Sequence, residues 1–370
     1  MNFWEKLPTP YFVVAPMADV TDAAFRRMLA KYGAHERADG SVGGPDVMWT
    51  EFVAADGLVR ATPEGKAKLM ADLIYSEAER PIIAQLFTSN VAHMEYAANL
   101  CRELGFDGVD INMGCPDRSI EKQGCGSAMI KTPEVAREII RAAKRGARMG
   151  EDDGIPVSIK TRIGYNKDEI DTWIPILLEE RPAALTIHAR TRKEMSKAPA
   201  QWGRVARVVA LRDKLAPEVK IIGNGDVLSI DDARLKVAES GADGAMVGRA
   251  LFGNPWFFHP TRQLPHKLTA LPTHGVDREK LISHDVSDET VEYVPLRERL
   301  TVLVEHTKLF VELLPHKNFA VMKKHYKAYV NGFPGAAELR RELMEQNTPA
   351  EIEQVVNAFI QTHVDTIDNF

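Results

Sequence analysis

Short apolar runs alternate with amphipathic stretches between residues 11 and 250. Several runs are continuous in Val, Ile and Leu, which is typical of parallel strands buried on both faces. The pattern predicts eight strands, at Tyr11–Ala15, Asp46–Glu51, Ile82–Phe87, Gly108–Asn112, Pro156–Lys160, Ala183–His188, Val219–Asn224 and Gly244–Gly248. The clearest helices predicted between them are Val91–Leu104, Pro133–Arg145 (with Thr132 as N-cap) and Ile230–Ser240.

Eight strand–helix units over roughly 250 residues match the size of a (β/α)8 TIM barrel, an α/β fold. A doubly wound sheet is the alternative architecture. It is less favoured because no GxGxxG sequence follows the first predicted strand.

The pattern changes after the barrel region. Pro260–Pro295 is rich in Pro, His, Asp and Thr and predicts a linker or extended connection. The rest predicts an all-helical C-terminal domain with helices Leu296–Leu313, Asn318–Val330, Ala336–Glu345 and Pro349–Ile367, the last capped by Thr348. We therefore expect a catalytic barrel at 1–259, a connection at 260–295 and a helical domain at 296–370.

Composition narrows the function classes. The 370 residues are 45% hydrophobic and carry a net charge of −5, so a surface for nucleic acid would have to be a local patch. Three cysteines argue against a disulfide framework, and their spacing matches no common zinc site, so no metal is expected. No signal peptide or apolar membrane span is apparent, which predicts a cytoplasmic protein without a membrane partner.

Polar or reactive residues stand at the carboxyl end of each predicted strand. In a (β/α)8 barrel this end is the catalytic face. One such residue is more often structural than functional, but its recurrence on all eight strands favours a site. The residues are Pro16 and Met17, Glu51, Gln85, Asn112 and Cys115, Lys160 and Arg162, His188, Asn224, and Gly248 with Arg249.

The ends of the last two strands predict a phosphate site. Asn224-Gly225-Asp226 and Gly248-Arg249 offer backbone N–H groups, glycines that permit close approach, and one charge. Lys160 could stabilise negative charge on a reduced flavin, and Gln85 could bind the edge of its pyrimidine ring. His188 either borders the same cavity or is a core histidine.

Cys115 lies on a loop just past the fourth predicted strand, where a thiol could donate a proton or act as a nucleophile. The polar stretch Asp117–Ser127 that follows could form a mobile lid. Cys101 falls on the apolar side of a predicted helix and is expected in the core. The sequence leaves the role of Cys125 open and favours a structural one.

A series of motifs makes a family resemblance recognisable: Ala15-Pro16-Met17-Ala18, Val20-Thr21-Asp22, Phe25-Arg26, Asp110–Pro116, Ile159–Arg162, Thr186–Thr191, Ile222–Asp226, Met246–Ala250 and Asn254–Phe257. In content, order and spacing the series resembles the tRNA-dihydrouridine synthases. The resemblance covers residues 9–260 well and the helical tail more loosely. The chain departs from the family pattern at Ala34–Pro45 and Pro260–Pro295, which look like insertions, and at Cys125, where a small residue is more usual.

The resemblance implies an FMN barrel that reduces uridine in tRNA, with NADPH as the source of electrons. Hydride would pass from the flavin to C6, and Cys115 would protonate C5. Asn112, Arg162 and Arg190 would hold the base or its backbone. The implied FMN-binding residues are Pro16, Met17, Ala18, Gln85, Lys160, His188, Asn224, Gly225, Asp226, Gly248 and Arg249.

The C-terminal tail bears on the choice between this interpretation and its alternatives. Residues 317–341 contain six Lys or Arg and one acidic residue, and Tyr326 and Tyr329 are interleaved with them, which is compatible with an RNA surface or with an ordinary solvated helix. Contacts to tRNA phosphates are expected from Lys323, Lys324 and Lys327. The alternatives are an FMN barrel acting on a small molecule, such as a dihydroorotate dehydrogenase-like enzyme, and a non-catalytic RNA-binding protein. Neither the target uridine nor the oligomeric state follows from the sequence.

Overall fold

The chain folds into two compact units in a computed structural model that describes residues 2–37, 40–264 and 291–363. Unit 1 contains the described residues up to Ala18 together with Asp46–Gly248. Unit 2 contains Asp19–Pro45 and the described residues from Arg249 onward. The first helix of the chain, α1 (Ala23–Tyr32), is therefore part of the same unit as the C-terminal helices.

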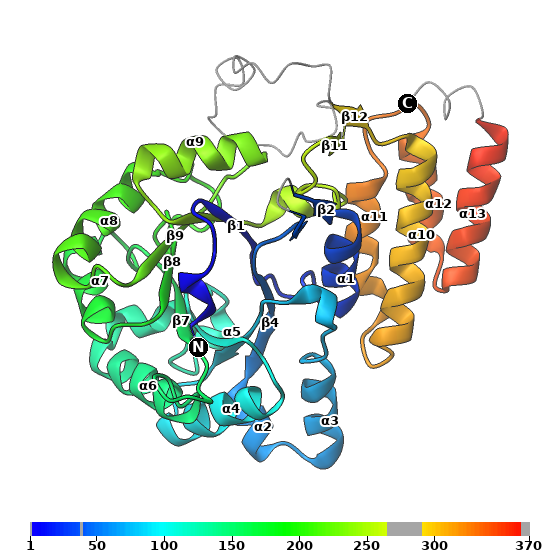
Figure 1. Cartoon of the computed structure of the whole chain (residues 1–370). Coiled ribbons are helices and arrows are strands. Elements are labelled where there is room, and N and C mark those ends of the chain that lie inside the picture. Colours follow the sequence, from blue (N-terminus) through cyan, green and yellow to red (C-terminus); the bar gives the residue numbers. More distant parts are fainter. Residues whose placement is uncertain (1, 38–39, 265–290, 364–370) are drawn as a thin grey trace. The chain divides into compact units, whose positions relative to one another are not determined.

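Unit 1 is an eight-stranded parallel barrel, which confirms the predicted fold class (Figure 1). The strands pair in the order β4 to β10 and then β1. A bridge between Val13 and Val47 joins β1 to the start of β4, and the Val14 N–H donates to the Val47 carbonyl at 3.0 Å. The strands are β1 (Tyr11–Val14), β4 (Met48–Ala54), β5 (Ile82–Phe87), β6 (Gly108–Met113), β7 (Val157–Arg162), β8 (Ala184–His188), β9 (Lys220–Asn224) and β10 (Gly244–Val247).

Helices of unit 1 lie outside these strands, as Figure 1 shows for α6 to α9. They are α2 (Ala55–Arg60), α3 (Pro63–Ala71), α4 (Val91–Glu103), α5 (Arg118–Glu121), α6 (Pro133–Gly146), α7 (Ile170–Glu179), α8 (Gly203–Leu215) and α9 (Ile230–Ser240). Thr132 occupies the N-cap position of α6 as predicted, but its side chain makes no capping hydrogen bond. Across both units, no described helix is long and apolar enough to cross a membrane.

Aromatic packing seals the end of the barrel where the strands begin. The short 3₁₀ turn η1 (Phe3–Glu5) places Trp4, only 1% exposed, against the first residue of β1 and the second of β4. Its ring centroid lies 5.6 Å from that of Tyr11 and 6.0 Å from that of Trp49. Because this end is filled with apolar groups, the polar side chains that follow along the strands are left for the opposite end.

Unit 2 is mainly helical, and the described part of the chain from Leu296 onward is helical as predicted. Its helices are α1, α10 (Leu296–Leu313), α11 (Lys323–Tyr329), α12 (Ala336–Glu345) and α13 (Pro349–Thr362), with 3₁₀ turns η4 (Arg249–Leu251) and η8 (Phe319–Val321). The continuous helix predicted at Asn318–Val330 is wrong, because η8 and α11 divide that segment. Thr348 caps α13 through a capping box, as predicted.

The two segments that look like insertions contribute short strands. Within Ala34–Pro45, β2 (His35–Glu36) pairs antiparallel with β3 (Val42–Gly43). At the ends of the predicted connection, β11 (Arg262–Gln263) pairs in parallel with β12 (Glu292–Tyr293). The remainder of that prediction, residues 265–290, and the end of the last predicted helix lie outside the described residues.

A buried histidine pair lies in the core of unit 2. His306 of α10 and His325 of α11 are both fully buried, with ring centroids 4.7 Å apart. The rings of Phe25 and Phe252 pack against His325, at 5.4 Å and 5.9 Å between centroids. Burial lowers the pKa of His325 to about 3 and also lowers the pKa of His306. Both imidazoles are therefore neutral in the folded protein at ordinary pH.

The histidine pair predicts how stability depends on pH. As the pH falls below about 6.5, the unfolded chain takes up these protons before the folded chain does, so stability is lost in that range. His325→Phe removes one of the two groups and places a third phenyl ring between Phe25 and Phe252. Between pH 6.5 and 5 the variant should lose about 2 kcal/mol less unfolding free energy than the unsubstituted protein. Urea unfolding at both pH values measures this difference, and parallel pH profiles would contradict it.

Candidate active site

The register of the parallel strands determines which side chains of the site lie next to one another. Asp110 and Asn112 are two residues apart in β6, so their side chains project from the same face of the strand. The register places Gln85 of β5 and Ser158 of β7 beside Asp110. The Asp110 carboxylate accepts from Gln85 Nε2 at 2.7 Å and from Ser158 Oγ at 2.6 Å, and burial raises its pKa to about 6. At neutral pH this carboxylate is an acceptor only.

Asn112 extends this series of hydrogen bonds toward Cys115. Because Gln85 directs its amide nitrogen at Asp110, its carbonyl oxygen accepts from Asn112 Nδ2 at 3.0 Å. Asn112 Oδ1 in turn accepts from the backbone N–H groups of Gly114 at 3.2 Å and Cys115 at 2.9 Å. Asp110 therefore determines which group donates in each hydrogen bond of this series.

The loop carrying Cys115 is fixed from the other side as well. The Cys115 carbonyl accepts from the Ser127 N–H at 2.9 Å and from its hydroxyl at 2.8 Å. Gly126 between them has φ +60°, and a Cβ there would lie 2.6 Å from the Cys115 oxygen, so this position requires glycine. The stretch Asp117–Ser127, predicted to be a mobile lid, contains α5, and its last residue makes the two hydrogen bonds to the Cys115 carbonyl.

The three thiols differ in exposure. Cys115 is half-buried and packs against Phe87, Ile120 and Cys125, and burial raises the pKa of its thiol above the ordinary value. Cys101 and Cys125 are fully buried, and burial raises their pKa values to about 12 and about 11. Cys101 lies in the core, as predicted. A neutral thiol is suited to donating a proton and poorly suited to nucleophilic attack.

Lys160 supplies the positive charge of the site. Its Nζ donates to Asn224 Oδ1 at 3.1 Å, and Asn224 Nδ2 donates to the Met246 carbonyl at 2.9 Å, which links β7, β9 and β10. Burial lowers the pKa of Lys160 to about 8, and Arg162 contributes to this lowering. The ammonium group is thus mostly charged at neutral pH, although its surroundings oppose the charge.

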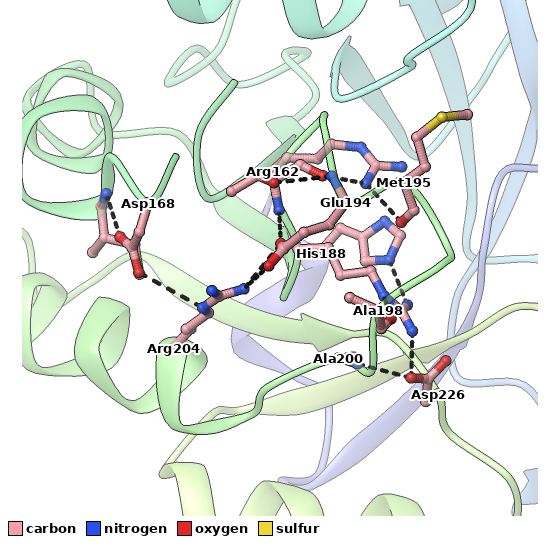
Figure 2. Close-up of polar contacts among 12 residues, drawn as sticks. Arg162, Asp168, His188, Glu194, Met195, Ala198, Ala200, Arg204 and Asp226 are labelled. Carbon is pink, nitrogen blue, oxygen red and sulfur yellow. Dashed lines mark hydrogen bonds and ion pairs between the residues drawn. The ribbon is translucent and has the colours of Figure 1, made fainter. Parts of the chain in front are cut away.

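His188 is oriented by a buried ion pair after β8 and β9. Arg190 donates to His188 Nε2 at 3.1 Å, so the neutral imidazole carries its proton on Nδ1. Arg190 also pairs with Asp226, which accepts from the Ala200 N–H at 2.8 Å (Figure 2). Gly225 has φ +125°, and a Cβ there would lie 2.7 Å from the Ala200 Cβ.

Arg162 ties the loops after β6 and β8 together. Its Nε donates to the Gly114 carbonyl at 2.7 Å. Its Nη1 lies 3.1 Å from the Thr191 carbonyl. It also lies 3.3 Å from the Met195 carbonyl (Figure 2). Burial lowers the pKa of this guanidinium to about 10. The arginine positions the Cys115 loop through the residue that precedes the cysteine.

The structure thus brings together, in unit 1, the predicted residues Gln85, Asn112, Cys115, Lys160, Arg162, His188, Arg190, Asn224, Gly225 and Asp226. Pro16, Met17, Ala18 and Gly248 are also in unit 1, and a Cβ on Gly248 would lie 3.4 Å from Met17 Sδ. Arg249 is the first residue of the second part of unit 2, which also contains Lys323, Lys324 and Lys327. Within the described residues, no group of three or more His, Cys, Asp or Glu side chains could hold a metal ion.

Two details of the sequence prediction require correction. Lys160 lies inside its strand, since β7 continues to Arg162, and Gln85 lies two residues before the end of β5, whose bounds are as predicted. Tyr326 and Tyr329 are fully buried, so neither ring is available to stack on an RNA base.

Sequence reasoning also missed two members of the site, Asp110 and Ser158. Each stands two residues before a residue that was identified, Asn112 and Lys160. Because side chains alternate along a strand, this spacing was the available signal.

Comparison with known proteins gives the family. A sequence model of the dihydrouridine synthase (Dus) family matches residues 13–364. "Probable tRNA-dihydrouridine synthase 2" of Bacillus subtilis (strain 168) is 36% identical over 369 residues, covering 99% of both chains. "Probable tRNA-dihydrouridine synthase" of Staphylococcus aureus (strain COL) is 35% identical over 362 residues, covering 97% of this chain and 95% of its own. Among solved structures, histamine dehydrogenase from Rhizobium sp. 4-9 has 13% identity and a TM-score of 0.46, over 67% of this chain and 45% of its own.

The fold and the site define a (β/α)8 barrel protein whose polar residues gather at the carboxyl ends of the strands. The chain belongs to the dihydrouridine synthase family.

The direction of donation in the hydrogen-bond series Asp110–Gln85–Asn112 can be tested by reversing it. Asn112→Asp keeps an acceptor for the Cys115 N–H but places a carboxylate against the carbonyl oxygen of Gln85. The variant should lose about 2 kcal/mol of unfolding free energy at pH 7, the cost of an unmade buried hydrogen bond. Part of this loss should be recovered at pH 5, because the crowded carboxylates have raised pKa values and take up a proton in the folded state.

The matched control exchanges the two residues. In Asp110→Asn/Asn112→Asp, Gln85 can turn its amide, accept from Asn at 110 and donate to Asp at 112, so every group is satisfied again. Stability at pH 7 should return to near that of the unsubstituted protein, as should that of Asp110→Asn alone. Urea unfolding measures all four proteins. A double variant as unstable as Asn112→Asp would contradict the proposed direction of these hydrogen bonds.

Proposed function

We propose that the protein reduces uridine in tRNA to 5,6-dihydrouridine, with FMN at the carboxyl ends of the strands and NADPH as the electron donor. The observation that carries the proposal is the half-buried, neutral Cys115 thiol, held by Asn112 on the same barrel end as the Lys160 ammonium. The printed names of the relatives support the reaction and the tRNA substrate. The same proposal includes a cytoplasmic location.

The residues present fit FMN. The Lys160 ammonium has only a neutral amide oxygen as a hydrogen-bond partner among the described residues, so it can still compensate an anionic ring. Gln85 retains one N–H and one lone pair beyond those used by Asp110 and Asn112. The proposed FMN-binding set remains Pro16, Met17, Ala18, Gln85, Lys160, His188, Asn224, Gly225, Asp226, Gly248 and Arg249.

The chemistry divides between the cofactor and the protein. FMN, when bound, would supply a hydride for C6 of the uracil ring and be reduced again by NADPH. Hydride addition leaves negative charge that a proton at C5 must neutralise, and the Cys115 thiol donates it. Asn112 and Arg162 keep the thiol on its loop by holding the backbone of Cys115 and Gly114.

Substrate contacts are part of the same proposal. Asn112, Arg162 and Arg190 would hold the base or its backbone through the donors that their protein contacts leave over. An extruded base is needed for such contact, because the reacting carbons are not accessible in a stacked helix.

The basic tail has less capacity for phosphate than its sequence suggests. Lys323 Nζ donates to the Met344 carbonyl at 2.7 Å, where α12 ends, and lies 3.3 Å from Asn347 Oδ1. Lys324 pairs with Asp19 at 2.9 Å. Lys327 is exposed and has no ion-pair partner in the described part of unit 2. Phosphate contacts from the tail are therefore proposed chiefly for Lys327, with Lys323 and Lys324 as weaker contributors.

Replacing the proposed proton donor gives the functional test. Purified protein with FMN, NADPH and unmodified tRNA should form dihydrouridine, measured by mass spectrometry of the nucleosides. Cys115→Ala should reduce the rate by about 10²–10⁴-fold, the usual contribution of a general acid. Reduction of the flavin by NADPH, followed by absorbance without tRNA, should change little.

Cys101→Ala and Cys125→Ala are the matched controls, because both thiols are buried and neither is held by Asn112. Both variants should keep most of the activity. Near-normal dihydrouridine formation by Cys115→Ala would exclude the assigned role. A folded, unsubstituted protein that forms no dihydrouridine would overturn the proposed reaction itself.

A further inference from the structure

Exposed cations gather on three neighbouring loops of unit 1. They follow β6, β7 and β8, and we call them the cationic rim: Arg118, Lys122, Lys131, Lys167, Lys193 and Lys197. Within the described residues none of the six has an ion-pair partner. Among the acids on these loops, Asp117 is exposed, Glu169 accepts from the Tyr165 N–H at 2.7 Å, and Glu121, Asp168 and Glu194 are each paired with an arginine. In a protein of net charge −5, this is a local positive surface.

The surface is unlike the arginine-rich outer face of the barrel. There Arg137 and Arg141 pair with Glu180, and Arg145 pairs with Glu95. Such internally compensated charges form an ordinary solvated face. On the cationic rim Glu121, Asp168 and Glu194 are engaged by other arginines and none of the six cations is paired in the described residues, so these charges are available for an external anion.

The rim is connected to the Cys115 loop by defined contacts. Lys131 Nζ lies 3.9 Å from the centre of the Tyr165 ring, and Arg192 lies 5.3 Å from it. Arg192 pairs with Glu121, and Glu121 Oε1 lies 3.0 Å from the Ser127 hydroxyl that contacts the Cys115 carbonyl. All three loops follow the carboxyl ends of their strands, as Cys115 does.

We propose that the cationic rim binds the phosphates of the substrate tRNA that flank the reacting uridine. The inference rests on the proposed function and extends it, because it moves a main part of phosphate binding from the tail lysines to the barrel. A base that enters the site carries its own phosphates with it, and these have to lie at the mouth formed by the βα loops. Flexible lysines around that mouth match a polyanion without reading its sequence.

The experiment compares two sets of charge removal on the full-length, FMN-loaded protein. The rim variant is Lys167→Gln, Lys193→Gln and Lys197→Gln together. The control is Lys6→Gln, Lys68→Gln and Lys214→Gln, three exposed lysines that precede strands and change the net charge equally. Affinity for unmodified tRNA is measured by anisotropy at several salt concentrations, alongside flavin content and thermal unfolding.

The rim variant should bind tRNA at least ten-fold more weakly at moderate salt. Its log–log salt dependence should be shallower by roughly 0.7–0.9 for each phosphate that the protein no longer neutralises. The control should match the unsubstituted protein, and flavin content and unfolding should be equal in all three. Lys327→Gln, measured in parallel, should have a smaller effect than the rim variant.

Two outcomes overturn the inference. Equal tRNA affinity and salt dependence for the rim and control variants would show that the rim does not hold phosphate. A weakening confined to Lys327→Gln would return phosphate binding to the tail. In either case normal dihydrouridine formation by the unsubstituted protein would leave the proposed function intact, whereas failure of that reaction would count against the function and not against the rim alone.

Discussion

The Asp110 carboxylate sets the direction of every hydrogen bond that leads to Cys115. A buried ionised acid can only accept, so Gln85 must present its amide nitrogen and pass its oxygen to Asn112. Asn112 is then left with an oxygen for the backbone of the cysteine loop. Such a chain has one low-energy arrangement because each member is satisfied only if its neighbours keep theirs. The position of the thiol therefore depends on a residue that does not contact it.

The barrel makes this arrangement possible by separating apolar from polar ends. Trp4, Tyr11 and Trp49 fill the end where the strands begin, and the parallel register aligns polar side chains of successive strands at the other. Burial then acts on the groups collected there. It raises the pKa of the Cys115 thiol and lowers that of Lys160. A neutral acid, and a cation whose hydrogen-bond partner in the described residues is a neutral amide, are what the proposed hydride–proton addition requires.

Much of this could be predicted from the sequence, because strands buried on both faces leave a strong apolar signal. All eight strands follow from that signal, and the helix Leu296–Leu313 follows from its own helical pattern. Contacts between distant side chains leave no such signal. Lys323 is an ordinary basic residue in the sequence, and only the fold shows that its ammonium caps the end of α12. Burial of Tyr326 likewise depends on packing within the helical unit, which a mixed polar and aromatic pattern does not reveal.

The proposed role of Cys115 as a proton donor requires that its thiol be neutral before the reaction. Thiolate absorbs near 240 nm, so titrating the unsubstituted protein and Cys115→Ser and subtracting the two curves isolates this one group. If the Cys115 thiol is neutral, the absorbance of the two proteins should not differ at neutral pH, and the difference curve should have its midpoint above the ordinary thiol pKa of about 8.5. A thiolate already present at pH 7 in the difference curve would contradict the proposed role, because a thiolate has no proton to give.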